Sequence, residues 1–229
     1  SSHNIPPYGL RRISCIKARA DCLRAAYPEL AQMFSEPREA GLQAVIDMSL
    51  PHYRHVLTRA DVVLADPDAV FAQLGTDVYF VFLRTKGKKP VRKIHQTRKQ
   101  VIDFIRKIAG ANPGSWKVIL SEAADVIYGG NVYVSREGQA KIEFRLGEQG
   151  PISAGTVVPE FRAWQKPFIG TWCYSFDDQV LRKTVYTMMR EIAHSGHDYL
   201  PGMYEFQLIP VRGDPEILKP RFVDYRKKW

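Results

Sequence analysis

The residues of this sequence whose types and spacing could do chemistry are two acids near its end, Glu205 and Asp224. Each lies in a short apolar run, and a loop with Gly213, Asp214 and Pro215 separates the runs, which is typical of strand, loop and strand. Facing side chains of antiparallel neighbours lie about 5 Å apart. Two carboxylates at this distance repel each other unless a cation lies between them or one is protonated. The pair therefore indicates a metal site, an acid/base pair, or two strand acids that face water.

A basic stretch is the second feature with chemical meaning. The chain of 229 residues has a net charge of +9, and residues 84–107 hold ten basic residues against one acid, Asp103, so ten minus one accounts for the whole excess. Such a local concentration of charge suits a polyanion, either a nucleotide triphosphate or a nucleic acid. An ordinary solvated basic face is the simpler alternative.

Other sites and locations are less favoured. The cysteines, Cys15, Cys22 and Cys173, have no metal-binding spacing, and their odd number is typical of reduced thiols in the cytosol. The sequence has no apolar run of about 18 residues and no apolar signal-peptide core at its start. Glycine-rich nucleotide loops, zinc spacings and known nucleic-acid modules are also missing. We therefore expect a cytoplasmic protein that does not span a membrane.

Helical spacing of apolar residues is found in the first third of the chain. It predicts helices at 14–27 and 39–50, and Asp66 is placed to cap a short helix at 69–74. We therefore expect residues 1–75 to form a helical N-terminal segment.

The remaining chain alternates between strand and helix patterns. It predicts strands at 77–83, 116–120, 131–134, 140–146 and 152–158, and helices at 98–109, capped by Thr97, and 177–194. The basic residues after the first strand are expected in a flexible loop, and residues 159–172 in an irregular excursion. Because strands gather in one run with helices interposed, we predict an α+β fold with mainly antiparallel sheets.

This order of elements resembles the ATP-grasp fold over Asp77 to Arg226, about two thirds of the chain. The resemblance implies two α+β lobes that clamp a nucleotide, at residues 76–123 and 124–229. In it, YGGNVYV and AKIEFRLGE look like the hairpin that opens the second lobe, and YEFQLI and FVDYR look like its last pair of strands. It also implies dependence on ATP and magnesium.

The resemblance assigns site residues by position. Basic side chains after the first strand would lie on the phosphates, namely Arg84, Lys86, Lys88 and Lys89. Either Arg84 or Lys117 is the candidate for the nucleotide-binding lysine of the first lobe, and Glu122, at the end of KVILSE, lies at the hinge that contacts the base. Glu205 and Asp224 would be the magnesium ligands, a ligand set that Mg²⁺ prefers together with phosphate oxygens.

The implied activity is that of an ATP- and magnesium-dependent ligase or phosphotransferase, which acts on an unidentified acceptor through a phosphorylated intermediate. Arg226 would steady the transferring phosphate. The family usually has an acid followed closely by Asn in the last strand, where this chain has Asp224, Tyr225 and Arg226. The alternatives are a catalytically inactive nucleotide-binding relative, or an RNA- or DNA-binding module that uses residues 84–107.

Overall fold

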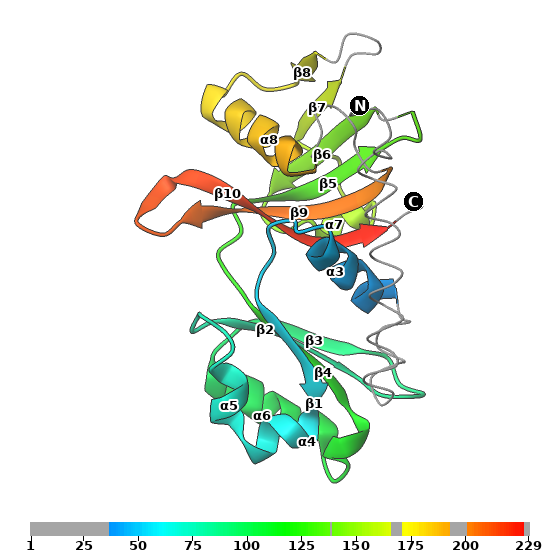
Figure 1. Cartoon of the computed structure of the whole chain (residues 1–229), viewed down its shortest axis with the longest axis vertical. Helices are drawn as coiled ribbons and strands as arrows, with labels where there is room; N and C mark the ends of the chain where they lie inside the picture. Colours follow the sequence, from blue (N-terminus) through cyan, green and yellow to red (C-terminus); the bar gives the residue numbers. More distant parts are fainter. Residues whose placement is uncertain (1–36, 138, 166–170, 193–200, 227–229) are drawn as a thin grey trace, which may run out of the picture. The chain divides into compact units, whose positions relative to one another are not determined.

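The computed structural model describes residues 37–137, 139–165, 171–192 and 201–226 (Figure 1). These residues fall into two compact units, one of residues 53–124 and one of residues 37–52 with 125–226. The helix expected at 14–27, with Cys15 and Cys22, lies outside the described residues. No helix in the described ranges is long and apolar enough to cross a membrane.

The smaller unit is a four-stranded antiparallel sheet with helices on one face (Figure 1). The strand order is β1 (His55–Arg59), β4 (Lys117–Glu122), β2 (Tyr79–Arg84) and β3 (Val91–Gln96). The helical elements are α4 (Ala60–Ala65), α5 (Pro67–Phe71), α6 (Arg98–Ala109) and the short 3₁₀ helix η3 (Pro113–Ser115). Val81 and Leu83 of β2 pack with Ile105 of α6 in one core, as alternation along a strand requires.

Two helix caps predicted from the sequence are confirmed. Thr97 accepts a hydrogen bond from the Gln100 backbone N–H at 3.2 Å, and the Gln100 side chain accepts in return from the Thr97 N–H. Asp66 likewise accepts from the Ala69 N–H at 3.2 Å and caps α5. Such caps satisfy backbone donors that a helix leaves unpaired at its first turn.

Two segments of this unit differ from expectation. Residues 91–93 end the basic stretch expected to be a flexible loop, yet they begin β3, because a short turn that contains Gly87 at φ 79° returns the chain antiparallel to β2. Residues 55–71, expected within the helical segment 1–75, include the strand β1. It joins this unit because its backbone pairs with β4.

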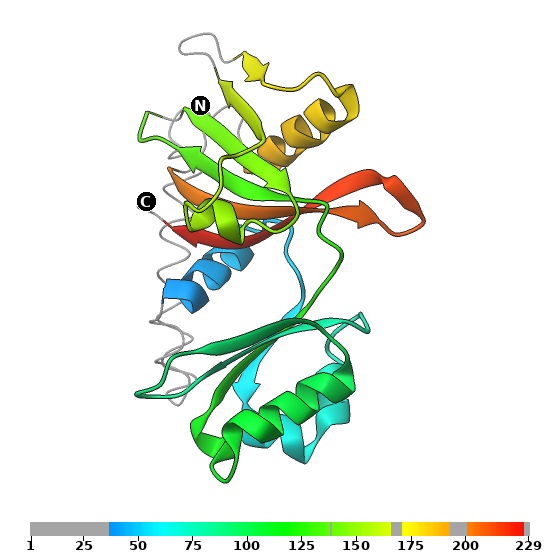
Figure 2. The ribbon, with the colours of Figure 1, turned by 180° about the vertical axis from the view of Figure 1, so that it is seen from behind.

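The larger unit is a six-stranded antiparallel sheet (Figure 2). Its order is β10 (Asp214–Arg226), β9 (Gly202–Val211), β5 (Tyr128–Val134), β6 (Ala140–Leu146), β7 (Phe161–Gln165) and β8 (Trp172–Tyr174). Its helices are α3 (Pro37–Asp47), α7 (Gly150–Ser153) and α8 (Gln179–Ile192). Buried residues of α3 and α8, such as Val45 and Met188, share one core with Phe144 and Phe206 of the sheet.

The α+β class, with antiparallel sheets, is confirmed, as are the hairpin of β5 and β6 and the closing hairpin of β9 and β10. The strand expected at 152–158 is wrong. Residues 150–153 form α7, with a proline in its first turn, and Gly155 ends the turn at φ 69°. The missing strand is β7, inside the excursion expected at 159–172, where it pairs with β6.

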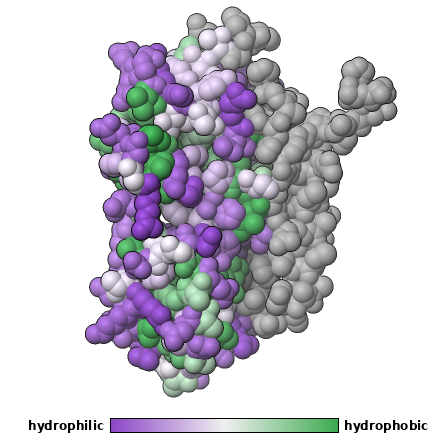
Figure 3. Space-filling model, turned by 60° about the vertical axis from the view of Figure 1, so that its left-hand side comes forward, coloured by the Kyte–Doolittle hydropathy of each residue, from purple (hydrophilic) through white to green (hydrophobic). Residues whose placement is uncertain are grey.

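Exposed apolar side chains occur on several elements of the larger unit, including Val180 of α8 and Ile217 of β10. On the face drawn in Figure 3, hydrophobic patches are separated by hydrophilic residues. Apolar residues scattered in this way are normal for a protein surface and mark no site by themselves.

Candidate functional site

The acid pair predicted from the sequence is brought together by the closing hairpin. Glu205 of β9 and Asp224 of β10 are direct partners in the register of the two strands. Direct partners project to the same face of a sheet with their Cβ atoms about 5 Å apart. Both are buried, with 8% and 3% of their surfaces exposed. The structure therefore excludes the interpretation that these acids simply face water.

A β-bulge is what places Asp224 on this face. Phe222 pairs with Phe206, and the next pair is Asp224 with Glu205, so Val223 is an extra residue in β10. In an unbroken strand Phe222 and Asp224 would share a face. The extra residue turns Asp224 to the opposite face, while Phe222 stays in the core. Bulges commonly re-aim a side chain in this way next to functional sites.

Tyr225, the residue that departs from the family pattern, points away from the acids. It pairs with Tyr204, their ring centroids are 4.9 Å apart, and its hydroxyl donates to the Pro201 carbonyl at 2.6 Å. Tyr225 is therefore a core residue. The next side chain on the acid face is that of Arg226, whose Nε donates to Asp224 Oδ2 at 3.3 Å.

Burial and repulsion act together on Asp224. Loss of solvent and, second to it, the charge of Glu205 raise the pKa of this carboxyl to about 6, against the lowering effect of Arg226 and of the Tyr225 N–H. The Tyr225 N–H donates to Oδ1 at 2.8 Å. A cation placed between the acids would favour their charged forms and so offset both causes of the raised pKa.

The Glu205 carboxylate, unlike that of Asp224, accepts no hydrogen bond from the described residues. Within the described ranges, no hydrogen-bond donor or ion-pair partner reaches its carboxylate. Buried carboxylates are normally hydrogen bonded, paired or bound to a metal. Two carboxylates fit Mg²⁺, which takes few protein oxygens and retains water or phosphate ligands. The described residues contain no group of three or more His, Cys, Asp or Glu side chains placed to hold a metal.

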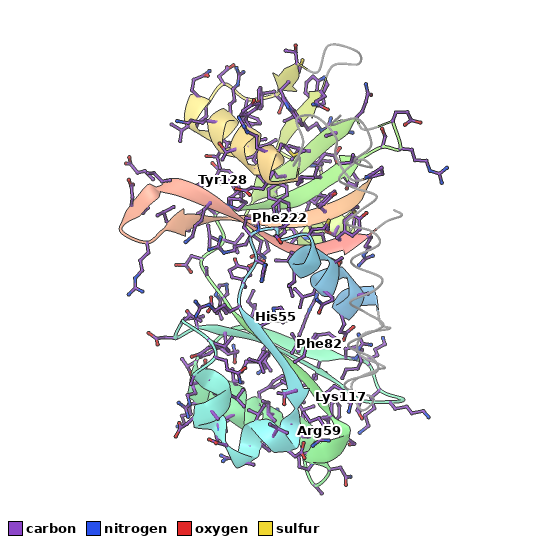
Figure 4. All side chains as sticks on the ribbon, in the orientation of Figure 1. His55, Arg59, Phe82, Lys117, Tyr128 and Phe222 are labelled. Atoms are coloured by element: carbon purple, nitrogen blue, oxygen red, sulfur yellow. The ribbon has the colours of Figure 1, made fainter. Side chains whose placement is uncertain are left out.

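The smaller unit brings together three cations, two of which the sequence analysis named. Lys117 is the direct partner of Arg84 on one side and of Arg59 on the other, and Figure 4 shows Arg59 and Lys117 at the same end of the sheet. Arg84 lies on the face of Phe82, opposite to the core residue Leu83. We call Arg59, Lys117 and Arg84 the cation row.

Arg59 was missed because no sequence pattern marked β1 as a neighbour of β4. Its Nε lies 3.2 Å from Asp61 Oδ1, and the Arg84 guanidinium lies 5.2 Å from the ring centroid of Phe82. Lys117 has no ion-pair partner in the part of the chain that the structure describes. Like charges directly opposite each other destabilise a sheet, and a bound anion would offset this cost.

The other predicted phosphate residues lie in the turn between β2 and β3. Lys86, Lys88 and Lys89 are exposed there, and Lys88 Nζ lies 5.7 Å from the ring centroid of Trp116. Glu122 ends β4, as predicted, and its Oε1 accepts from the Gly75 N–H at 2.7 Å. This bond uses one carboxylate oxygen to hold the loop before β2, and the role of Glu122 at a nucleotide base stays a prediction.

No family model matches the sequence, and no curated protein matches it. Solved structures that are similar to this chain include an L-amino acid ligase from Bacillus licheniformis, at 12% identity and a TM-score of 0.44, over 91% of this chain and 47% of that one. Another is the biotin carboxylase domain of the 2-oxoglutarate carboxylase from Hydrogenobacter thermophilus in complex with MgADP, ADP and bicarbonate. It has 9% identity and a TM-score of 0.43, over 88% of this chain and 41% of that one.

A third is the N5-carboxyaminoimidazole synthase from Aspergillus clavatus in complex with ADP and 5-aminoimidazole ribonucleotide. It has 10% identity and a TM-score of 0.42, over 87% of this chain and 46% of that one. These structures are ATP-grasp enzymes, the family that the order of elements resembles. The chain spans less than half the length of each. The likeness is one of fold alone, and because every TM-score is below 0.5, no activity follows from it.

Proposed function

We propose that the protein binds ATP with Mg²⁺ and uses it in a ligase or phosphotransferase reaction. The observation that carries this proposal is the pair of directly opposed, buried carboxylates, of which that of Glu205 has no hydrogen-bond donor or ion-pair partner among the described residues. Keeping two acids this close without a cation costs free energy, both from lost solvation and from repulsion. A magnesium ion that is also bound to phosphate oxygens would compensate both.

Each named side chain has a role in this proposal. Glu205 and Asp224 hold the metal, and Arg226, anchored on Asp224, directs its remaining N–H donors to the transferring phosphate. In the smaller unit, the cation row binds phosphate oxygens. The exposed lysines of the turn between β2 and β3 belong to the same unit as the cation row and can contact phosphate oxygens, because their side chains are long and solvated.

The chemistry that these residues support is transfer of a phosphoryl group. Such a transfer needs positioning and neutralisation of charge more than a protein nucleophile. A carboxylate or hydroxyl oxygen of the acceptor would bond to the γ-phosphorus as the bond to the β,γ-bridging oxygen breaks and ADP leaves. In a ligase, an amine would then displace phosphate from the acyl phosphate. The acceptor itself stays unassigned.

Titration calorimetry with ATP and Mg²⁺ tests the metal site. We expect Glu205→Gln and Asp224→Asn to lose the magnesium-dependent part of ATP affinity, by tenfold or more, because each removes a charged ligand. Glu216→Gln, at an exposed position of β10, is the matched control and should bind as the parent does. ATP binding that is unchanged in both acid variants would refute the assignment.

The phosphate side is tested with inorganic tripolyphosphate. Lys117→Gln should weaken its binding about tenfold, the equivalent of one charge-assisted hydrogen bond at roughly 1.5 kcal/mol. Lys107→Gln, at an exposed position on α6, is the control. Tight binding of RNA with a steep salt dependence, insensitive to Glu205→Gln, would instead favour the nucleic-acid function of residues 84–107.

A further inference from the structure

We propose that Asn131 is a third oxygen ligand of the metal site, a role that rests on the proposed function. Asn131 lies on β5, which neighbours β9 on the side opposite to β10. In the register of β5 and β9, Asn131 is the direct partner of Glu205. Asp224, Glu205 and Asn131 therefore form one row across three adjacent strands, all on the same face of the sheet.

Asn131 is fully buried, at 0% exposure, and its amide is oriented by two neighbours. Its Nδ2 donates to the Tyr133 hydroxyl at 3.1 Å, and its Oδ1 accepts from Ser153 Oγ at 3.2 Å. An amide oxygen has two lone pairs, and the Ser153 hydroxyl uses one of them. The second is left for a cation beside Glu205.

Beyond Asn131 the row offers no further uncommitted oxygen ligand for a metal. The next residue in register is Glu143 of β6, but its Oε1 lies 2.9 Å from Lys141 Nζ. That carboxylate is already neutralised by an ion pair. A neutral amide beside two carboxylates adds a ligand without adding a third negative charge, and carbonyl oxygens are normal ligands of hard divalent cations.

Manganese is the probe, because Mn²⁺ replaces Mg²⁺ at oxygen sites and is detected directly by electron paramagnetic resonance. We expect Asn131→Ala to weaken Mn²⁺ binding to the nucleotide-free protein by tenfold or more. Ser153→Ala removes the hydrogen bond to Oδ1 but no metal ligand, so it should bind Mn²⁺ as the parent does. Unchanged affinity in Asn131→Ala, with affinity lost in Glu205→Gln, would assign Asn131 a purely structural role.

A second measurement needs no substitution at Asn131 and so does not depend on the variant folding. The chain contains three asparagines, Asn4, Asn112 and Asn131. With ¹³C-labelled asparagine, electron–nuclear double resonance should show a ¹³C coupling to bound Mn²⁺ that persists in Asn112→Gln. Bound Mn²⁺ without that coupling would overturn the role of Asn131 alone. Mn²⁺ affinity that is unchanged in both Glu205→Gln and Asp224→Asn would overturn the metal site itself, and with it this inference.

Discussion

Asp224 is a buried carboxyl held beside a second one, and this should make the stability of the metal-free protein depend on pH. Its pKa is raised from 3.8 to about 6, so the folded state binds the proton more tightly than the unfolded state. The contribution of Asp224 to the free energy of unfolding is therefore greatest below about pH 4. It falls as the pH rises to about 6, by roughly 3 kcal/mol in all, and is then constant.

Urea denaturation at about pH 4 and pH 7, with a chelator present, measures this change. In Asp224→Asn we expect a smaller fall in the free energy of unfolding between the two pH values, because the amide does not titrate. Asp214→Asn, at the exposed start of β10, should keep the fall of the parent. The same fall in Asp224→Asn as in the parent would show that other groups cause it.

Single residues also explain why the candidate site was only partly predictable. Glu205 and Asp224 could be paired from the sequence because the apolar runs and the loop between them define a hairpin. The face of Asp224 could not, because it depends on the extra residue Val223, and a bulge leaves no clear mark in a pattern of alternation. For the same reason Tyr225 looked like a departure within the site, although it lies in the core.

Helix α3 packs closely against the Asp224 carboxylate of β10. A Cβ atom at Gly41 of α3 would overlap Asp224 Oδ1, so the helix can approach the strand this closely only with glycine at this position. We expect Gly41→Ala to lower the free energy of unfolding by about 1–3 kcal/mol, the usual cost of overpacking. Chemical denaturation measures it, and Gly150→Ala, where a Cβ would meet no atom within 4 Å, is the control.

A double-mutant cycle shows whether the contact with Asp224 is the cause. With Asp224→Ala in the background, Gly41→Ala should cost less, because the atom that it would overlap is gone. Equal costs in the two backgrounds would assign the effect to the propensity of the helix or to another neighbour.

At the scale of elements, success followed the strength of local signals. The strand at 79–84 and the capped helix α6 were predictable because their apolar periods and caps are clear. β1, β3 and β7 were missed, since their residues are mostly half-exposed or exposed and mark no continuous apolar face. Pairing with a neighbour far along the chain specifies such strands, and the register that creates the cation row arises in the same way.

At the scale of the molecule, the two units have separate hydrophobic cores, and the proposed function gives each unit its own ligand groups, the acid pair for Mg²⁺ and the cation row for phosphate. Without ligand we therefore expect calorimetry to resolve two thermal transitions. MgATP should raise both midpoints, because a ligand at a hundredfold excess over its dissociation constant stabilises the state that binds it by about 2.7 kcal/mol.

Tripolyphosphate without metal should raise only the transition of the smaller unit, which carries the cation row. In Glu205→Gln, MgATP should no longer raise the transition of the larger unit. If MgATP moves a single transition in the parent, one unit holds the nucleotide alone, and the acid pair and the cation row serve different ligands.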